Sequence, residues 1–269
     1  MIDSDQDRKG IIAQIFARAA AGYQRITHFP PLGQRLVELA QIPAGARVLD
    51  VASGRGAILF PAAERVGPQG KVIGVDISPG MVQATDAEIE RRGLTNVQIR
   101  QMDAEALDFP DGSFDYVLCG FALQFFPHLD RGLAEFWRVL RRQGRVAVST
   151  WGADDERWAW YKDLRVAYQA NVKLQSQSFE QPEFLEKRFN ESGFTGVQVL
   201  MEPFDWVCSQ PEEWWDAQWS MSSRAGLEKM EPLALDRFKA EVFQNMLALK
   251  QSDGLHELLR AQFTLAQKP

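Results

Sequence analysis

Cysteine and histidine are scarce in this chain of 269 residues, and their placement excludes several kinds of site. The two cysteines, Cys119 and Cys208, are too few for a disulfide framework and show no C-x-x-C spacing. The three histidines, at positions 28, 128 and 256, are scattered and form no H-E-x-x-H motif. We therefore expect no metal site, and a protein of a reducing compartment.

The chain also lacks long uncharged runs and any excess of basic residues. Its longest stretch without Asp, Glu, Lys or Arg covers 14 residues, 116–129, whereas a membrane span needs about 20. The first residues are acidic and lack the basic start and apolar core of a signal peptide. The net charge of −6 disfavours nucleic-acid binding. We expect a cytoplasmic protein with no membrane span and no nucleic-acid partner.

Tryptophan, by contrast, is plentiful and unevenly distributed. Of the eight tryptophans, Trp137 alone lies in the first 150 residues, and seven follow. These seven are Trp151, Trp158, Trp160, Trp206, Trp214, Trp215 and Trp219. The imbalance indicates that the two parts of the chain have different roles.

Between residues 45 and 150, predicted strands alternate with predicted helices. Strands are predicted over 47–51, 71–75, 97–100, 115–119 and 144–150, and helices over 57–65, 79–92 and 130–141. The middle helix has clear ends, because Ser78 can cap it, Pro79 fits its first turn and Gly93 follows it. This alternation predicts βαβ units and a doubly wound α/β core.

Further elements are predicted on both sides of this core. Helices are expected over 5–21 and 32–40, and after residue 151 over 154–172, 182–192, 212–221 and 233–249, with strands over 196–204 and 258–266. Helices inserted between late strands of such a sheet usually form a lid. The predicted units are therefore N-terminal helices covering the ligand site (1–44), the α/β core (45–151), and a helical lid insertion with the closing strands (152–269).

The most informative segment is V-L-D-V-A-S-G-R-G at residues 48–56, where a strand runs into a glycine-rich turn. Gly54 and Gly56 allow positive φ and a close backbone approach to a ligand. A dinucleotide site would have a third glycine three residues after Gly56, but that residue is Leu59. Asp50 at the end of the strand suits a cationic ligand, and the α-ammonium of an amino acid is one candidate.

Two further carboxylates follow the next two strands. Asp76 lies 22 residues after Gly54, where a carboxylate accepts hydrogen bonds from ribose hydroxyls. Asp103 follows the third strand and could accept a hydrogen bond from an adenine amino group. Together the three carboxylates fit a neutral ribose and adenine joined to a positively charged amino-acid tail.

These residues make the chain resemble the class I S-adenosylmethionine-dependent methyltransferases, and within them the ubiquinone/menaquinone-biosynthesis branch. The resemblance covers about residues 16–150 and rests on four linked segments: V-L-D-V-A-S-G-R-G (48–56), V-I-G-V-D-I-S-P-G-M (72–81), D-A-E-A-L-D-F-P-D-G-S-F-D (103–115), and V-L before G-R-V (139–146). It implies a Rossmann-like, doubly wound, seven-stranded sheet, mostly parallel with the last strand antiparallel. The implied cofactor is S-adenosyl-L-methionine, with S-adenosyl-L-homocysteine as its product.

The resemblance also implies a set of cofactor-binding residues: Tyr23, Asp50, Ala52, Ser53, Gly54, Gly56, Asp76, Ile77, Met81, Asp103, Ala104, Gly120 and Phe121. The residues of the first turn would surround the methionine part, and those after the second and third strands the ribose and adenine. Gly120 and Phe121 would approach the sulfonium, and Tyr23 would cover the cofactor.

Two positions depart from the family pattern. Ala52 stands where many members have Gly, although Ala is common in the branch named above, and Gln124 stands where relatives often have His. No residue is marked as an obligatory base. His128, His28 and Tyr23 are the candidates for catalysis, and the alternative for each histidine is a structural role such as capping a helix.

The resemblance implies in-line methyl transfer, and we expect a small organic acceptor of apolar or aromatic character. The tryptophan-rich part is expected to enclose it, although for each of its tryptophans a place in the core is expected over a place in the pocket wall. An asparagine/aspartate-Pro-Pro-aromatic turn, typical of nucleic-acid amino-methyltransferases, is absent, since residues 119–122 read C-G-F-A. Two alternatives stay open: a nicotinamide-dependent oxidoreductase on a similar fold, and a non-catalytic partner protein of methyltransferase fold. The acceptor, the methylated atom and the oligomeric state, a homodimer included, are also open.

Overall fold

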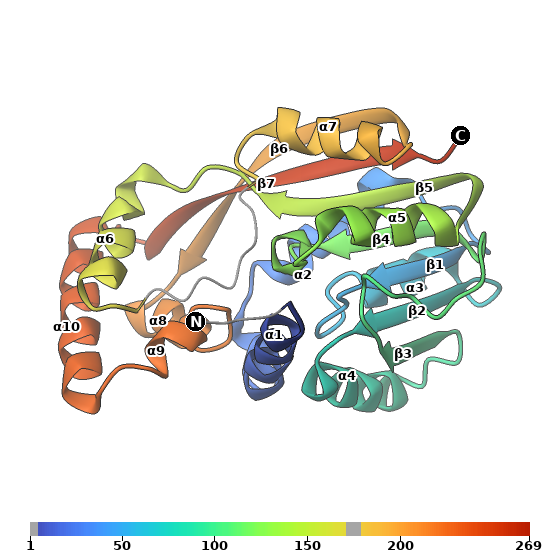
Figure 1. Ribbon diagram of the computed structural model, residues 1–269. Coiled ribbons are helices and arrows are strands. Elements are labelled where there is room, and N and C mark those ends of the chain that lie inside the picture. The colour runs from blue at the N-terminus through green and yellow to red at the C-terminus, as the bar shows by residue number, and fades with distance from the viewer. Residues whose placement is uncertain (1–4, 171–178) are drawn as a thin grey trace.

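A seven-stranded sheet forms the centre of the computed structural model, which describes residues 5–170 and 179–269 (Figure 1). Its strands are β1 (Arg47–Val51), β2 (Lys71–Asp76), β3 (Val97–Gln101), β4 (Phe114–Gly120), β5 (Leu140–Trp151), β6 (Thr195–Cys208) and β7 (Leu255–Gln267). They lie in the order β3-β2-β1-β4-β5-β7-β6. Neighbours from β3 to β5 pair in parallel, whereas β7 is antiparallel to both β5 and β6. The predicted sheet, with its last strand antiparallel, is confirmed.

Helices cover both faces of the sheet. On one face lie α2 (Phe29–Ala40), α3 (Leu59–Val66) and α4 (Pro79–Arg92), and on the other lie α5 (Leu129–Val139) and α7 (Pro182–Glu191). Each buries its apolar stripe, as α5 does with Leu129, Leu133 and Phe136. Ser78 caps α4 by accepting a hydrogen bond from the backbone N–H of Met81, and Gly93 ends it, as predicted. The result is a three-layer α/β core.

The N-terminal helix α1 (Asp5–Ala19) crosses the carboxyl end of this core beside α4 (Figure 1). The two helices approach so closely that a Cβ on Gly80 would lie 2.7 Å from Cα of Ala17. On its other side α1 contacts the short helix α9 (Arg224–Leu227), which the sequence did not predict. A 3₁₀ turn, η1 (Tyr23–Arg25), then leads into α2.

β6 and β7 are longer than predicted, and they continue as a two-stranded ribbon past the end of β5. The last residue of β5, Trp151, pairs with Ala261, but β6 still pairs with residues 255–259 of β7. This extension carries η3 (Glu156–Trp158) and the helices α6 (Ala159–Ala167), α8 (Pro211–Gln218), α9 and α10 (Pro232–Leu249). α6 ends before the predicted residue 172, and residues 171 and 172 lie outside the described range.

The tryptophans after Trp151 fill the core of this helical unit. Trp158, Trp206, Trp214 and Trp215 are buried there, and Trp160 and Trp219 pack against them. Trp158 stacks on Trp214 with ring centroids 4.9 Å apart. A small unit of short helices needs large side chains to exclude enough water. Their packing together is therefore structural, as expected for each of these tryptophans taken singly.

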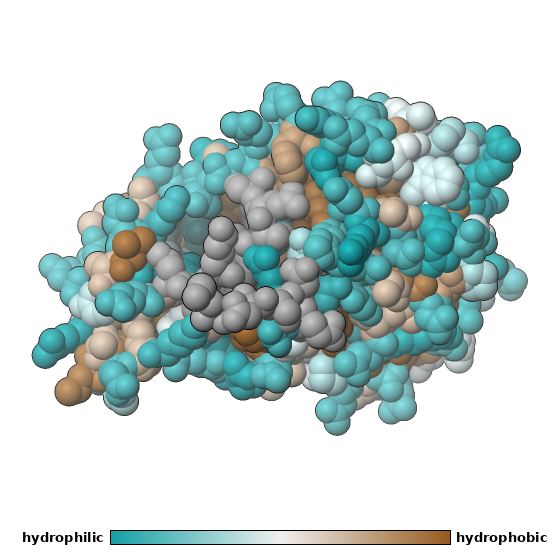
Figure 2. Space-filling view, in the orientation of Figure 1, coloured by the Kyte–Doolittle hydropathy of each residue, from teal (hydrophilic) through white to brown (hydrophobic). Residues whose placement is uncertain are grey.

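The surface is mainly polar on the face shown in Figure 2, where hydrophobic residues lie in small separate groups. Among the described residues, none of the helices combines the length and the apolarity that crossing a membrane would require.

The helical unit should depend on its own core. Phe238 on α10 is fully buried, whereas Leu247 on the same helix is 65% exposed. We expect Phe238→Ala to lower the free energy of unfolding by about 3–5 kcal/mol through lost burial and a cavity. Leu247→Ala is the matched control and should change it by less than about 0.5 kcal/mol. Urea unfolding followed by tryptophan fluorescence measures both, and equal effects of the two substitutions would contradict this assignment of the core.

Candidate active site

The loop after β1 brings backbone atoms close to the carboxyl edge of the sheet. Gly54 and Gly56 have φ angles of +52° and +83°, in the region that favours glycine. Ala52 has a φ of +55° despite its Cβ, and such strain concentrates at ligand sites. The N–H of Ser53 donates to the carbonyl of Val75 on β2 at 3.0 Å. The loop is thus held against the neighbouring strand in the conformation that its glycines predicted.

Asp76, at the end of β2, joins this loop to the start of α4. Its Oδ2 accepts a hydrogen bond from the N–H of Gly54, and its Oδ1 accepts one from the N–H of Ser78, both at 2.8 Å. The side chain is buried, and burial raises the pKa of Asp76 to about 6 against the effect of these two hydrogen bonds. Lone pairs that the backbone leaves free can accept further hydrogen bonds from a ligand.

Asp50 is fully buried next to the same loop. The hydroxyl of Ser53 donates to its Oδ2 at 2.7 Å. Its Oδ1 has no hydrogen-bond partner in standard geometry among the residues that the structure describes. Burial raises the pKa of Asp50 to about 7, and the nearby charge of Asp76 acts in the same direction. A cationic donor that reached this oxygen would favour the ionised carboxylate.

Arg55 places a positive charge beside the same small cavity as Asp50. It lines, with Asp50, Ser53 and Tyr23, a small cavity of about 400 Å³ that includes space open to solvent. Its Nη1 donates to the carbonyl of Ala20 at 2.6 Å, and its buried Nε has no hydrogen-bond partner within the described parts of the chain. A carboxylate and a guanidinium around one small cavity are complementary to a zwitterion.

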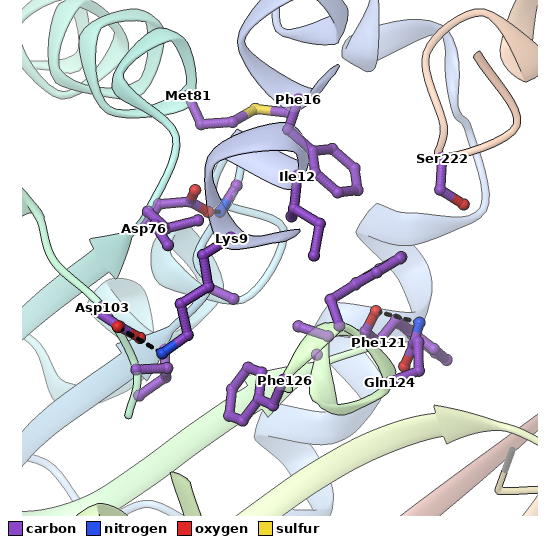
Figure 3. Close-up of a pocket in the computed structure, with 18 of the residues that line it drawn as sticks. Lys9, Ile12, Phe16, Asp76, Met81, Asp103, Phe121, Gln124, Phe126 and Ser222 are labelled. Carbon is purple, nitrogen blue, oxygen red and sulfur yellow. Dashed lines mark hydrogen bonds and ion pairs between the residues drawn. The ribbon is translucent and has the colours of Figure 1, made fainter. Parts of the chain in front are cut away.

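A larger cavity of about 1050 Å³, also including space open to solvent, adjoins the first. It lies between α1, the carboxyl ends of the strands and the turn before α9 (Figure 3). The structure brings together in its wall most of the predicted cofactor-binding residues: Tyr23, Ala52, Gly54, Asp76, Ile77, Met81, Asp103, Ala104, Gly120 and Phe121. Asp50 and Ser53 line the smaller cavity, and Gly56 lies in neither wall.

Six aromatic side chains of the larger cavity form a continuous series, which we call the aromatic belt. In order of contact it consists of Phe125, Phe16, Tyr23, Phe29, Phe121 and Trp151. Tyr23 stacks on Phe29 at 5.5 Å, and Phe121 stacks on Trp151 at 3.9 Å. The wall is therefore aromatic as predicted, but five of its six rings precede Trp151 in the chain.

The cavity has two ends with different chemistry (Figure 3). At one end Lys9 lies against Asp103, beside Asp76. At the opposite end lie the amide of Gln124 and the hydroxyl of Ser222. Nε2 of Gln124 donates to the carbonyl of Phe121 at 2.7 Å. The end at Lys9 and Asp103 can bind charged and hydrogen-bonding groups of a ligand. The opposite end is apolar apart from the neutral side chains of Gln124 and Ser222.

The candidate catalytic residues occupy three different settings. His28 is buried against Phe29 and Trp206, outside the cavity wall, and burial lowers its pKa to about 3. His128 stands at the start of α5, where its backbone N–H donates to Glu105. Tyr23 lines both cavities, and burial raises its pKa, so that the phenol stays protonated at neutral pH.

The sequence did not mark Lys9, Glu105, Met221 or Ser222, which also line the larger cavity. Met221 and Ser222 precede α9, whose place over the core depends on contacts distant in sequence. For Lys9 a signal existed, because it stands three and seven residues before Ile12 and Phe16. This spacing places one lysine on the apolar face of α1, and both hydrophobic residues share the cavity wall with it.

Comparison with known proteins identifies a family and several relatives. Residues 42–189 match a family model described as a methyltransferase domain. The chain is 41% identical to aklanonic acid methyltransferase DauC of Streptomyces sp. (strain C5), over 54% of this chain and 67% of that protein. It is 33% identical to nocamycin O-methyltransferase of Saccharothrix syringae, over 87% and 90%. It is also 36% identical to ubiquinone/menaquinone biosynthesis C-methyltransferase UbiE of Stenotrophomonas maltophilia, over 53% and 59%.

A solved structure supports the fold. The YcgJ protein of Bacillus subtilis matches with a TM-score of 0.62 and 22% identity, covering 90% of this chain and 98% of that one.

The buried carboxyls predict a dependence of stability on pH. The pKa values of Asp50 and Asp76 are raised by folding, so the folded state binds more protons than the unfolded state between about pH 4 and 7. These groups therefore contribute stability below that range, and the contribution is lost as the pH rises through it. We expect Asp50→Asn to reduce this loss by an amount on the order of a few kcal/mol. Thermal unfolding of the wild type and of Asp50→Asn from pH 4.5 to 7.5 tests the expectation. If the stability of both changed with pH in parallel, the expectation would be contradicted.

Proposed function

Because this chain belongs to the methyltransferase domain family and is an S-adenosylmethionine-dependent methyltransferase, we propose that it methylates a small organic acceptor of apolar or aromatic character by in-line transfer. One observation carries the proposal. Two adjoining cavities bring together carboxylates, a pocket complementary to a zwitterion and the aromatic belt.

The charged end of the larger cavity and the smaller cavity together support a place for each part of the cofactor. Asp76 would accept hydrogen bonds from the ribose hydroxyls, and Asp103 would accept one from the adenine amino group. Ile77 and Met81 present apolar surface for the adenine ring. Asp50 and Arg55 would bind the ammonium and carboxylate of the methionine part in the smaller cavity.

The aromatic belt supports an acceptor with a planar, apolar body. S-adenosylmethionine supplies a methyl group that is already activated, so the protein has mainly to position the acceptor and exclude water. Gln124 and Ser222 can hydrogen-bond a polar group of the acceptor. The faces of Tyr23 and Phe121 would also favour the positive charge of a sulfonium.

The known relatives leave the methylated atom open. One is named for O-methylation and another for C-methylation. Among the described residues of the wall, the titratable side chains are Lys9, Tyr23, Asp76, Asp103 and Glu105, and four of these form the charged end. Because Tyr23 stays protonated, it can donate a hydrogen bond to an acceptor oxygen but cannot serve as a base at neutral pH.

The proposal is tested by a cofactor screen followed by an acceptor screen. We expect S-adenosylhomocysteine, but not NAD, to raise the melting temperature, since a ligand of the folded state stabilises it. With S-adenosylmethionine present, mass spectrometry should then show methyl addition to members of a panel of aromatic acids, phenols and quinones. Stabilisation by NAD alone would favour an oxidoreductase, and binding without transfer to any acceptor would favour a non-catalytic protein.

Substitution of Asp76 should weaken cofactor binding. Loss of charged hydrogen bonds to the ribose costs about 1.5–3 kcal/mol, or roughly ten- to a hundredfold in affinity. We expect Asp76→Ala to raise the dissociation constant for S-adenosylhomocysteine by this factor in calorimetry. Asp86→Ala, which removes an exposed carboxylate from the same helix that follows Asp76, is the control. An unchanged constant in Asp76→Ala would refute the ribose role.

Substitution in the aromatic belt should weaken binding of the acceptor. Phe125 contacts Phe16 edge to face at 5.4 Å and lines the cavity. We expect Phe125→Leu to raise the KM for the acceptor several-fold, because loss of an aromatic contact costs about 0.5–1.5 kcal/mol, while affinity for S-adenosylhomocysteine changes little. Phe243→Leu, at a partly buried ring that packs against the core of the helical unit, is the matched control. Equal kinetic effects of the two substitutions would argue against an acceptor site at the belt.

A further inference from the structure

Lys9 connects α1 to the loop that follows β3. Its Nζ donates to Oδ2 of Asp103 and to Oε2 of Glu105, each at 2.7 Å (Figure 3 shows the first pair). The side chain of Glu105 is 3% exposed, that of Lys9 15% and that of Asp103 35%. The pair of Lys9 with Glu105 is therefore shielded from solvent, where screening is weak and a charge needs a partner, whereas the pair with Asp103 is partly exposed.

The two carboxylates are also held by backbone groups. Oδ1 of Asp103 accepts a hydrogen bond from the N–H of Glu105 at 2.9 Å. Oε1 of Glu105 accepts one from the N–H of His128 at 2.8 Å. Lys9 thus completes a network that joins α1, the loop after β3 and the start of α5. All three segments border the larger cavity.

The charges of this network require the lysine. Two carboxylates separated by one residue would repel each other, and the ammonium lies within hydrogen-bond distance of both. Burial lowers the pKa of Lys9, but the hydrogen bonds and charges of Asp103 and Glu105 outweigh this and raise it above the ordinary value. Lys9 is therefore fully charged at neutral pH, and each Asp103 oxygen has one donor bound and lone pairs left over.

We propose that Lys9 is a positioning residue for nucleobase recognition. It fixes the Asp103 carboxylate so that its remaining lone pairs meet the exocyclic amino group of adenine, and it acts through Asp103 rather than on the base. The inference rests on the proposed function, since it assumes that adenine lies at Asp103. It predicts that Lys9 governs selectivity for the amino group and not only overall affinity.

A simple tethering role for Lys9 would have a different consequence. α1 is also held by Arg18, whose Nη2 donates to Oε2 of Glu228 at 2.7 Å, at the opposite end of the helix from Lys9. If Lys9 only kept α1 in place, loosening the helix at Arg18 would affect the cofactor in the same way. Arg18→Gln is therefore the matched control, because it weakens the attachment of α1 without contact with Asp103.

The experiment compares two ligands by calorimetry: S-adenosylhomocysteine and its purine analogue without the exocyclic amino group. For the wild type we expect adenine to be preferred by about tenfold or more, because a charge-assisted hydrogen bond is lost in the analogue. Lys9→Met should reduce this preference to within about threefold, and Lys9→Arg should retain most of it. Arg18→Gln should leave the preference unchanged, even where it lowers both affinities.

A double-mutant cycle provides a second measurement. In Asp103→Asn we expect the preference to be lost with Lys9 in place, and adding Lys9→Met should cause no further loss. An unchanged preference in Lys9→Met, an equal loss in Arg18→Gln, or additive losses in the double variant would each overturn the proposal. A wild type that does not bind S-adenosylhomocysteine would instead refute the proposed function. One that binds both ligands equally refutes the adenine roles of Asp103 and Lys9 but leaves the methyltransferase function standing.

Discussion

The shape of the cavity depends on the buried carboxylate of Asp76. Its two hydrogen bonds to backbone N–H groups fix the loop after β1 and the start of α4 relative to each other. The close contact between Gly80 and Ala17 then sets the position of α1 on α4. Since α1 supplies both Lys9 and Phe16, the charged end and part of the aromatic belt take their places from the same constraint.

This arrangement places groups that destabilise the folded state at the site. Packing elsewhere in the molecule supplies the compensating stability. Asp50 and Asp76 are buried near each other, and each pKa is raised because the ionised form is poorly solvated. Ala52 and Phe121, at the ends of β1 and β4, both have positive φ. Hydrophobic cores on each face of the sheet and in the helical unit offset these costs.

The fold and the gathering of the predicted residues at the carboxyl ends of the strands could be predicted from the sequence, because both depend on short-range signals. Strand and helix periodicity, the cap at Ser78 and the spacing from Gly54 to Asp76 are all local. The tryptophans were ambiguous, because a large apolar ring looks the same in sequence whether it fills a core, as Trp214 does, or lines a cavity, as Trp151 does. The ion pair of Lys9 with Asp103 joins residues 94 positions apart, and no local pattern specifies such a pairing.

The charges around the cavities affect how tightly the methyl donor and its product would bind in the proposed reaction. Asp50, Asp76, Asp103 and Glu105 face Lys9 and Arg55, so the wall is acidic when its carboxyls are ionised. The donor carries one more positive charge than the product left after methyl transfer. In the proposed complex the aromatic belt would keep water from this charge and thereby strengthen its attraction to the carboxylates. The same wall would thus hold the donor more strongly than the product, without any movement of the protein.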